Sequence, residues 1–191
     1  MANEFFALMS RMRNITRWSL MRNTFSENIQ EHSHQVAMLA HALAVIRREV
    51  LHLDGPDPDR CAVAALYHDA TETLTGDMPT PIKYYNPQIK EAYKQVERIA
   101  GERLVAMLPE QLQAHYEPII HEHDEDIRMV VKAADKLSAY IKCIEEQKAG
   151  NTEFESAAKQ TMDSMKAMEC AELDWFIETC LPAFLLNLDQ L

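Results

Sequence analysis

The stretch LYHDATETLTGDMPTP, Leu66 to Pro81, places His68 directly beside Asp69. Glu72 follows three residues after Asp69, and Asp77 comes soon after it. Four groups that bind protons or metal ions therefore lie within ten residues, either as the ordinary polar end of a helix or as the centre of a site. Neighbours on a helix point about 100° apart, so other elements must bring further ligands if these groups share one ion.

The chain around this stretch is dominated by helix-forming residues. It has only four glycines in 191 residues, and runs of alternating β-branched residues are missing. Both observations predict an all-α fold, and we expect one domain over residues 1–191, with TGDMPTP (75–81) as a loop because glycine and proline break helices. The expected helices run from about Asn3 to Arg13, Glu31 to Leu53, Pro58 into the His68 stretch, Pro87 to Leu108, briefly between Pro109 and Pro118, Asp124 to Gln147, and then in two further helices, the last near Asp174 to Leu186.

The composition narrows the class of protein. The formal net charge of −11 disfavours non-specific binding to nucleic acid or to an anionic membrane. No apolar run approaches the length of a membrane span, and the N-terminus lacks the order of a secretory signal. The cysteines form no CxxC pair and are expected to be reduced thiols: Cys61, Cys143, Cys170 and Cys180. We expect a soluble, cytoplasmic protein.

His68 and Asp69 offer an imidazole nitrogen and a carboxylate oxygen, which suit a borderline divalent metal such as zinc, manganese, iron or cobalt. A surface pair at a helix end is the ordinary alternative. Glu72 lies four residues after His68, so both project from one helix face. Its carboxylate is a candidate base for a metal-activated water, and without a metal it is an exposed helix glutamate.

Two other helices carry candidate ligands. Asp135 falls at the edge of an apolar helical stripe, next to Val131, where either a solvated aspartate or a ligand beside the core fits. His32 begins the second long helix, and His34 follows in a different direction. At most one of these two histidines can point at a given ion, and their spacing alone does not choose between them.

Basic residues gather near the N-terminus, where Glu4 is the only acid in the first 22 residues. Arg17 stands beside Trp18, and a guanidinium with an adjacent aromatic ring can hold a phosphate and a sugar or base. A basic helix end with a buried tryptophan is the alternative. The acidic cluster HEHDED, His121 to Asp126, is a further possible metal binder, but we interpret it as a helix N-terminal cap with exposed histidines.

In order along the chain, His32, the His68-Asp69 pair and Asp135 form an H…HD…D pattern on three expected helices. This resembles the HD-domain metal-dependent phosphohydrolases. The segments RWSLMRN, ENIQEHSHQVAM, YHDATETLTGDMPTPIKYYN and KAADKLSAYIKCIEE more closely resemble the bacterial 5′-deoxynucleotidase family, over nearly the whole chain. The resemblance implies an all-α HD-domain helical bundle, a homodimer, and hydrolysis of deoxyribonucleoside 5′-monophosphates to deoxynucleoside and phosphate. It also implies a divalent cation, cobalt or manganese first, with zinc, iron or copper as alternatives.

The resemblance assigns roles residue by residue. It implies that His32, not His34, is a metal ligand, together with His68, Asp69 and Asp135. Arg17 matches the residue that orients the phosphate, Trp18 the aromatic beside the deoxyribose, and Glu72 a glutamate needed for activity, while Asp69 can share the handling of the water proton. The implied substrate-binding residues are Arg17, Trp18, His32, Asp69, Asp77, Met78, Pro79, Thr80 and Asp135. The alternatives are an HD enzyme acting on a triphosphate or alarmone, and a non-catalytic metal or nucleotide sensor.

Overall fold

The structure, a computed structural model, describes residues 3–83 and 85–191. Its regular elements there are helices. One isolated backbone bridge pairs Thr16 with Asn28. The α-helices are α1 (Phe5–Met9), α2 (Ile29–Val45), α3 (Pro58–Tyr67), α4 (Glu72–Thr75), α5 (Thr80–Lys83), α6 (Pro87–Ala106), α7 (Glu110–Ile120), α8 (Glu125–Lys148), α9 (Glu155–Lys166) and α10 (Ala171–Thr179). No described helix is both long and apolar enough to cross a lipid bilayer.

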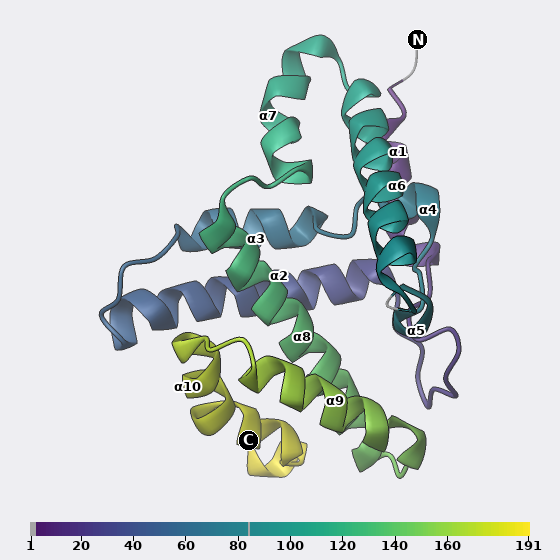
Figure 1. Ribbon diagram of the computed structural model, residues 1–191. Coiled ribbons are helices and arrows are strands. Elements are labelled where there is room, and N and C mark those ends of the chain that lie inside the picture. Colours follow the sequence, from purple (N-terminus) through teal and green to yellow (C-terminus); the bar gives the residue numbers. More distant parts are fainter. Residues whose placement is uncertain (1–2, 84) are drawn as a thin grey trace.

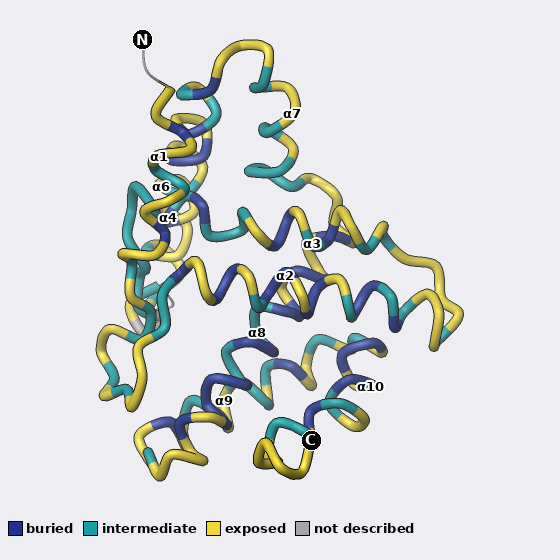
Figure 2. The backbone as a smooth tube through the Cα atoms, turned by 180° about the vertical axis from the view of Figure 1, so that it is seen from behind, coloured by how far each residue is buried: buried dark blue, intermediate teal, exposed yellow. Residues whose placement is uncertain are grey.

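The centre of the fold is the packing of α2 against α3, with α8 crossing both (Figure 1). Helices α6 and α7 lie beyond α3, whereas α9 and α10 pack on the opposite side, along α8 and near the C-terminus. Buried residues such as Leu43 of α2, Ala65 of α3 and Leu137 of α8 form one apolar core. Figure 2 shows that the buried positions follow the inward faces of these helices. This packing brings α2, α3 and α8, which come from separate parts of the sequence, into contact with one another.

Local sequence signals start the three central helices. Asn28 caps α2 by accepting a hydrogen bond from the backbone N–H of Glu31, and the Glu31 carboxylate accepts one from the backbone N–H of Asn28, which forms a capping box. Asp57 caps α3 ahead of Pro58, and Asp124 caps α8. Asp124 belongs to the HEHDED cluster, so the interpretation of that cluster as an acidic cap is confirmed at this residue.

Several predicted boundaries need correction. The first helix is α-helical only to Met9 and continues as a 3-10 turn, Ser10–Asn14. Helix α2 ends at Val45 and gives way to a π-helical turn, Ile46–Val50. The predicted 75–81 loop is shorter, because Thr75 still belongs to α4 and α5 begins at Thr80. Proline is tolerated in the first turn of a helix, where no intrahelical hydrogen bond is lost.

Candidate metal and phosphate site

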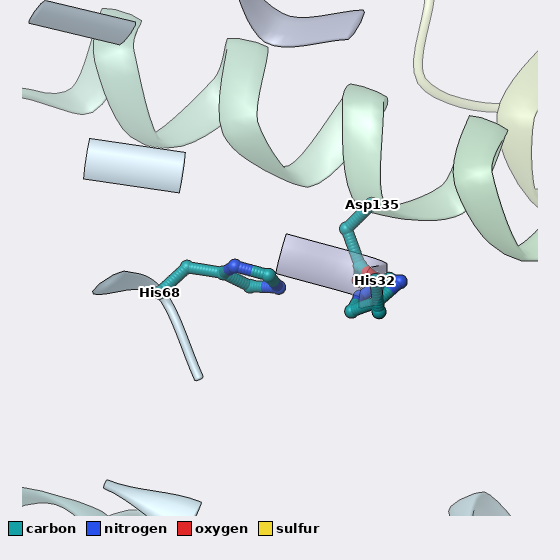
Figure 3. Close-up of side chains that lie close together, drawn as sticks. All are labelled: His32, His68 and Asp135. Atoms are coloured by element: carbon teal, nitrogen blue, oxygen red, sulfur yellow. The ribbon is translucent and has the colours of Figure 1, made fainter. Parts of the chain in front are cut away.

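The two histidines of the predicted pattern meet inside the molecule. His32 lies in the first turn of α2 and is fully buried, and His68 directly follows the last residue of α3. Asp135 projects from the middle of α8, and Figure 3 shows its side chain and that of His68 converging on His32. The ligand atoms of these three residues all lie within 4.8 Å of one another. Within the described part of the chain they are the one group of this kind, so the HEHDED cluster forms none there.

Asp69 completes the cluster from the turn that follows α3. Its Oδ2 lies 3.1 Å from His68 Nε2 and 3.6 Å from His32 Nε2. Asp135 Oδ1 lies 3.1 Å from His32 Nε2 on the other side. Asp69 therefore contacts both imidazoles, and Asp135 contacts the imidazole of His32. His34, by contrast, is exposed.

Hydrogen bonds on the far side of each ring select the nitrogen that faces the cluster. His68 Nδ1 lies 2.7 Å from the carbonyl oxygen of Ala65, so this nitrogen carries the proton and donates it. His32 Nδ1 lies 3.2 Å from Ser138 Oγ, and the Ser138 hydroxyl donates to Gln35 Oε1 at 2.6 Å. The hydroxyl oxygen can then accept from Nδ1 of His32. In its neutral form, each imidazole thus turns an Nε2 lone pair toward the cluster.

Both Nε2 atoms are buried and lack a hydrogen-bond partner within residues 3–83 and 85–191. Such buried, unpaired polar atoms are rare because their desolvation is costly. His32 Nε2 is close to Asp135, but the contact does not have hydrogen-bond geometry. Nitrogen lone pairs facing carboxylates in a buried setting are the donor set that suits a borderline divalent cation. The residues present therefore fit the cation that the sequence pattern implied.

The electrostatics of the cluster are those of closely packed opposite charges. Burial would lower the pKa of His68, but neighbouring Asp69 and Asp135 outweigh it and raise that pKa to about 9. Burial would raise the pKa of Asp135, but contact with His32 and the positive potential of His68 and Arg17 lower it to about 2. The pKa of Asp69 is likewise below its ordinary value, since His68, His32 and Arg17 together outweigh burial.

The segment between the first 3-10 turn and α2 carries Arg17 and Trp18 to the edge of the cluster. Arg17 Nη1 lies 3.5 Å from Asp69 Oδ2, so the guanidinium borders the candidate metal site. Its Nε donates to Glu27 Oε2 at 3.1 Å, and Trp18 Nε1 donates to the same oxygen at 2.9 Å. Arg17 is thus held between two carboxylates, with its terminal nitrogens toward the cluster.

Glu72 begins α4 and is 7% exposed, and its Oε2 has no hydrogen-bond partner among the described residues. Burial, together with the negative potential of Asp69 and Asp77, raises the pKa of Glu72 to about 9. Asp77 is half-buried in the segment after Gly76, and its pKa is also raised, by burial first and then by Asp69. The charge of Asp69 in the cluster therefore contributes to the pKa of both carboxyl groups.

The rest of the predicted sugar-binding segment is less fully placed. Met78 and Pro79 are half-buried, and the carbonyl of Pro79 accepts hydrogen bonds from the backbone N–H groups of Ile82 and Lys83 as α5 begins. Thr80 starts that helix, but its side chain lies outside the described part of the structure.

A model of the 5′-deoxynucleotidase YfbR-like family matches residues 4–184 of the chain. The chain belongs to this family. The 5′-deoxynucleotidase of Cronobacter sakazakii is 48% identical over 191 residues, which cover 99% of this chain and 96% of the relative. The 5′-deoxynucleotidase YfbR of Escherichia coli is 47% identical over the same shares. The predicted family and hydrolase class are confirmed.

Solved structures confirm the HD-domain fold of this YfbR-like protein. An HD-domain phosphohydrolase of Listeria innocua superposes with a TM-score of 0.81, at 21% identity, over 97% of this chain and 90% of the other. The HD phosphohydrolase DatZ of cyanophage S-2L, solved with dA and one catalytic Zn²⁺ ion, has a TM-score of 0.67 at 20% identity, over 92% and 95%. The prediction of a single all-α HD domain is therefore correct.

Three residues that contact the site were not identified from the sequence, namely Ser138, Gln35 and Glu27. Ser138 follows Asp135 by three residues and Gln35 follows His32 by three, a spacing that places each pair on one helix face and could have suggested them. Glu27 had no such signal, because the segment around it has no helical periodicity.

Proposed function

We propose that this protein hydrolyses deoxyribonucleoside 5′-monophosphates to deoxynucleoside and phosphate, at a divalent cation held by His32, His68, Asp69 and Asp135. The observation that carries the proposal is the pair of buried, unpartnered Nε2 atoms of His32 and His68, facing two carboxylates. Family membership supports the substrate class, since the relatives at 47–48% identity are named 5′-deoxynucleotidases.

The donor set of two imidazoles and two carboxylates accepts several first-row metals. We propose cobalt or manganese from the family resemblance, and the Zn²⁺ in DatZ supports the same class of ion. When bound, the cation supplies positive charge that neutralises phosphate oxygens and makes the attacking water more acidic.

Arg17 is proposed to bind and orient the phosphate. Its Nε is occupied by Glu27, and Nη1 points toward Asp69, so the Nη edge is the part available to phosphate oxygens. A guanidinium forms paired hydrogen bonds with phosphate in a fixed plane, which holds the phosphorus in line with an attacking water. The phosphate would replace the long contact between Arg17 and Asp69 with shorter ones.

Glu72 is proposed to accept the water proton at Oε2, with Asp69 as a second carboxylate able to share this role. With a pKa of about 9, Glu72 holds a proton at neutral pH when no cation is bound, so its role as a base depends on the cation. Burial raises this pKa first and the negative potential of Asp69 and Asp77 adds to it. A bound cation would lower the pKa again because opposite charge favours the ionised form.

Trp18 and Asp77 are proposed to select the deoxy sugar, with the other substrate contacts in the Met78, Pro79 and Thr80 segment. A 2′-hydroxyl would either clash with the indole or leave a buried polar atom unpaired. An apolar wall rejects an added hydroxyl by about 100-fold, and an unpaired polar group adds more. The position of Trp18 beside Arg17, which borders the metal ligands, supports this placement.

The test is phosphate release from dAMP, AMP and dATP by the purified protein with cobalt or manganese, repeated with EDTA. We expect release from dAMP alone, abolished by chelation. Equal turnover of AMP would overturn the selectivity assigned to Trp18 and Asp77 while keeping the phosphohydrolase. Release from dATP but not dAMP would indicate a triphosphate hydrolase, and no release from any substrate would overturn the proposal in favour of another ester or a sensor.

The homodimer implied by the family resemblance is also a proposal. Sedimentation velocity at micromolar concentration tests it, and a single monomeric species would overturn it.

A further inference from the structure

We propose that Glu27 is a positioning residue that locks Arg17 and Trp18 together, so that phosphate orientation and sugar selection depend on one carboxylate. This inference rests on the proposed function for its catalytic readout, although its geometry can be tested without catalysis.

The central observation is a shared acceptor. One oxygen, Glu27 Oε2, accepts from the Arg17 Nε–H at 3.1 Å and from the Trp18 Nε1–H at 2.9 Å. The side chains of Glu27 and Arg17 are only 11% and 14% exposed, so water competes weakly for these hydrogen bonds. Charge-assisted hydrogen bonds are among the stronger ones in proteins. A displacement of Glu27 would therefore move both donors.

The backbone reinforces the pairing. The carbonyl of Glu27 accepts from the N–H of Arg17 at 3.0 Å, and the N–H of Ile29 donates to the carbonyl of Ile15 at the same distance. With the bridge between Thr16 and Asn28, these contacts close the segment into a loop whose two ends lie side by side. Glu27 thus contacts Arg17 through both its backbone and its side chain.

Trp18 needs such a restraint because its backbone is left-handed, with φ of +56°. A bulky residue rarely adopts this conformation, and it persists only where the surroundings impose it. One face of the indole packs near Phe154, with ring centroids 5.3 Å apart. The hydrogen bond to Glu27 adds a directional contact that fixes the N–H edge of the indole.

Arg17 needs a restraint for a different reason. It feels attraction from four carboxylates, those of Asp135, Asp69, Glu27 and Asp77. Asp69 and Asp135 belong to the metal cluster, and Nη1 of Arg17 already lies 3.5 Å from Asp69. The hydrogen bond from Nε holds Arg17 on a carboxylate outside that cluster, and this keeps the Nη edge available for phosphate.

The far end of the loop has its own anchors, so Glu27 is not needed to hold the loop on the protein. Glu146 of α8 accepts from the N–H and the hydroxyl of Thr24, and Asn151 donates to the carbonyl of Arg22. Glu153 accepts from the N–H of Arg22 at 3.1 Å. A change at Glu27 should therefore alter the geometry of Arg17 and Trp18 without releasing the loop.

The experiment compares Glu27→Gln with Glu153→Gln, an equal loss of charge at the other end of the same loop. The neutral amide oxygen can still accept from both donors, but without its negative charge it holds each of them more weakly. Glu27→Gln should therefore raise KM for dAMP about tenfold and lower the dAMP-to-AMP ratio of kcat/KM by a similar factor. Bound metal and the melting temperature should stay near wild type. Glu153→Gln should leave KM and the ratio unchanged.

A double-mutant cycle with Trp18→Ala separates the two contacts. The Trp18→Ala protein has no indole at this position, so Glu27→Gln should still raise KM there through Arg17. The dAMP-to-AMP ratio of kcat/KM should be the same in the double variant as in Trp18→Ala alone. An equal change of the ratio in both backgrounds would overturn the proposed link through the indole. Unchanged KM and ratio in the single variant would overturn the whole inference.

A spectroscopic measurement tests the geometry even if the protein hydrolyses no dAMP. The chain has two tryptophans, so Trp175→Phe leaves Trp18 as the sole tryptophan, whose fluorescence is excited apart from that of tyrosine. Acrylamide should quench Trp18 more readily after Glu27→Gln, because an uncharged acceptor holds the indole N–H more weakly. Glu153→Gln should leave the quenching unchanged. Equal quenching in both variants would overturn the inference independently of the proposed function.

Discussion

A single hydroxyl, that of Ser138, determines how His32 presents itself to the site. It lies 3.2 Å from His32 Nδ1 and donates its own proton to Gln35, so it accepts from the imidazole. Hydrogen bonds of this kind to a metal-binding histidine typically change metal affinity by about 10- to 100-fold when they are lost. We expect Ser138→Ala to weaken cobalt or manganese binding by that factor, measured by calorimetric titration of the metal-free protein.

Ser33 provides the matched control for that measurement. It is buried beside His32, and its hydroxyl has no hydrogen-bond partner among the described residues. Ser33→Ala makes the same chemical change without touching the ring of His32, so metal affinity should stay within about twofold of wild type. Equal losses in both variants would mean that Ser138 acts through packing and not through the imidazole.

Helix α8 also contacts the loop between Arg17 and Glu27, through Lys142 and Glu146, which form a buried ion pair one helical turn apart. Lys142 is 2% exposed and Glu146 fully buried, and Glu146 also accepts from Thr24 and Asn151. Burial would raise the pKa of Glu146, but Lys142, Thr24 and Asn151 outweigh it and lower the pKa to about 2. A carboxylate whose folded pKa lies below its unfolded value, 4.5, stabilises the fold above that value. The stabilisation is lost as the pH falls from 4.5 toward 2.

We therefore expect Glu146→Gln to lower the free energy of unfolding by on the order of 3 kcal/mol at pH 7, and by progressively less from pH 5 to pH 3. Urea unfolding of both proteins at each pH measures the difference. Glu145→Gln, an exposed neighbour on the same helix, should change the free energy by less than about 0.5 kcal/mol throughout. A wild-type-to-Glu146→Gln difference that stays constant with pH would contradict the depressed pKa.

Across the whole molecule, the sequence predicted the helices because periodic apolar residues and helix breakers are local signals. Asp57 before Pro58 and Asp124 before α8 are caps that can be recognised without a structure. Spacing could not choose between His32 and His34, since that choice depends on which side of α2 faces α8. The structure buries His32 and leaves His34 exposed.

The role of Glu27 could not be predicted for a related reason. Its contacts join residues ten apart across an irregular loop, and such pairings depend on how the loop folds back on itself. The short helix α5 was missed because proline was taken only as a helix breaker, although its first-turn positions accept it. Local patterns thus predict elements, whereas contacts between loops and helices require the assembled fold.

The proposed ligands come from α2, from the end of α3 and from α8, the three helices that form the core. A cation bound there would connect all three and is absent from the unfolded chain, so binding should stabilise the fold. At a metal concentration 100 times Kd the gain is about 2.7 kcal/mol, which corresponds to a rise in Tm of roughly 5 to 10 °C for a domain of this size. Thermal melts with manganese or cobalt, against EDTA, measure the rise.

His34 offers the control that makes this test specific, because it is exposed two residues after His32. His34→Ala should keep the full metal-dependent rise, whereas His32→Ala should abolish it. Asp135→Asn provides a second variant if His32→Ala folds poorly, since Asp135 is more exposed and its amide keeps the same shape. A metal-dependent rise that survives both His32→Ala and Asp135→Asn would place the cation elsewhere. Loss of the rise in His34→Ala alone would reverse the choice between the two histidines.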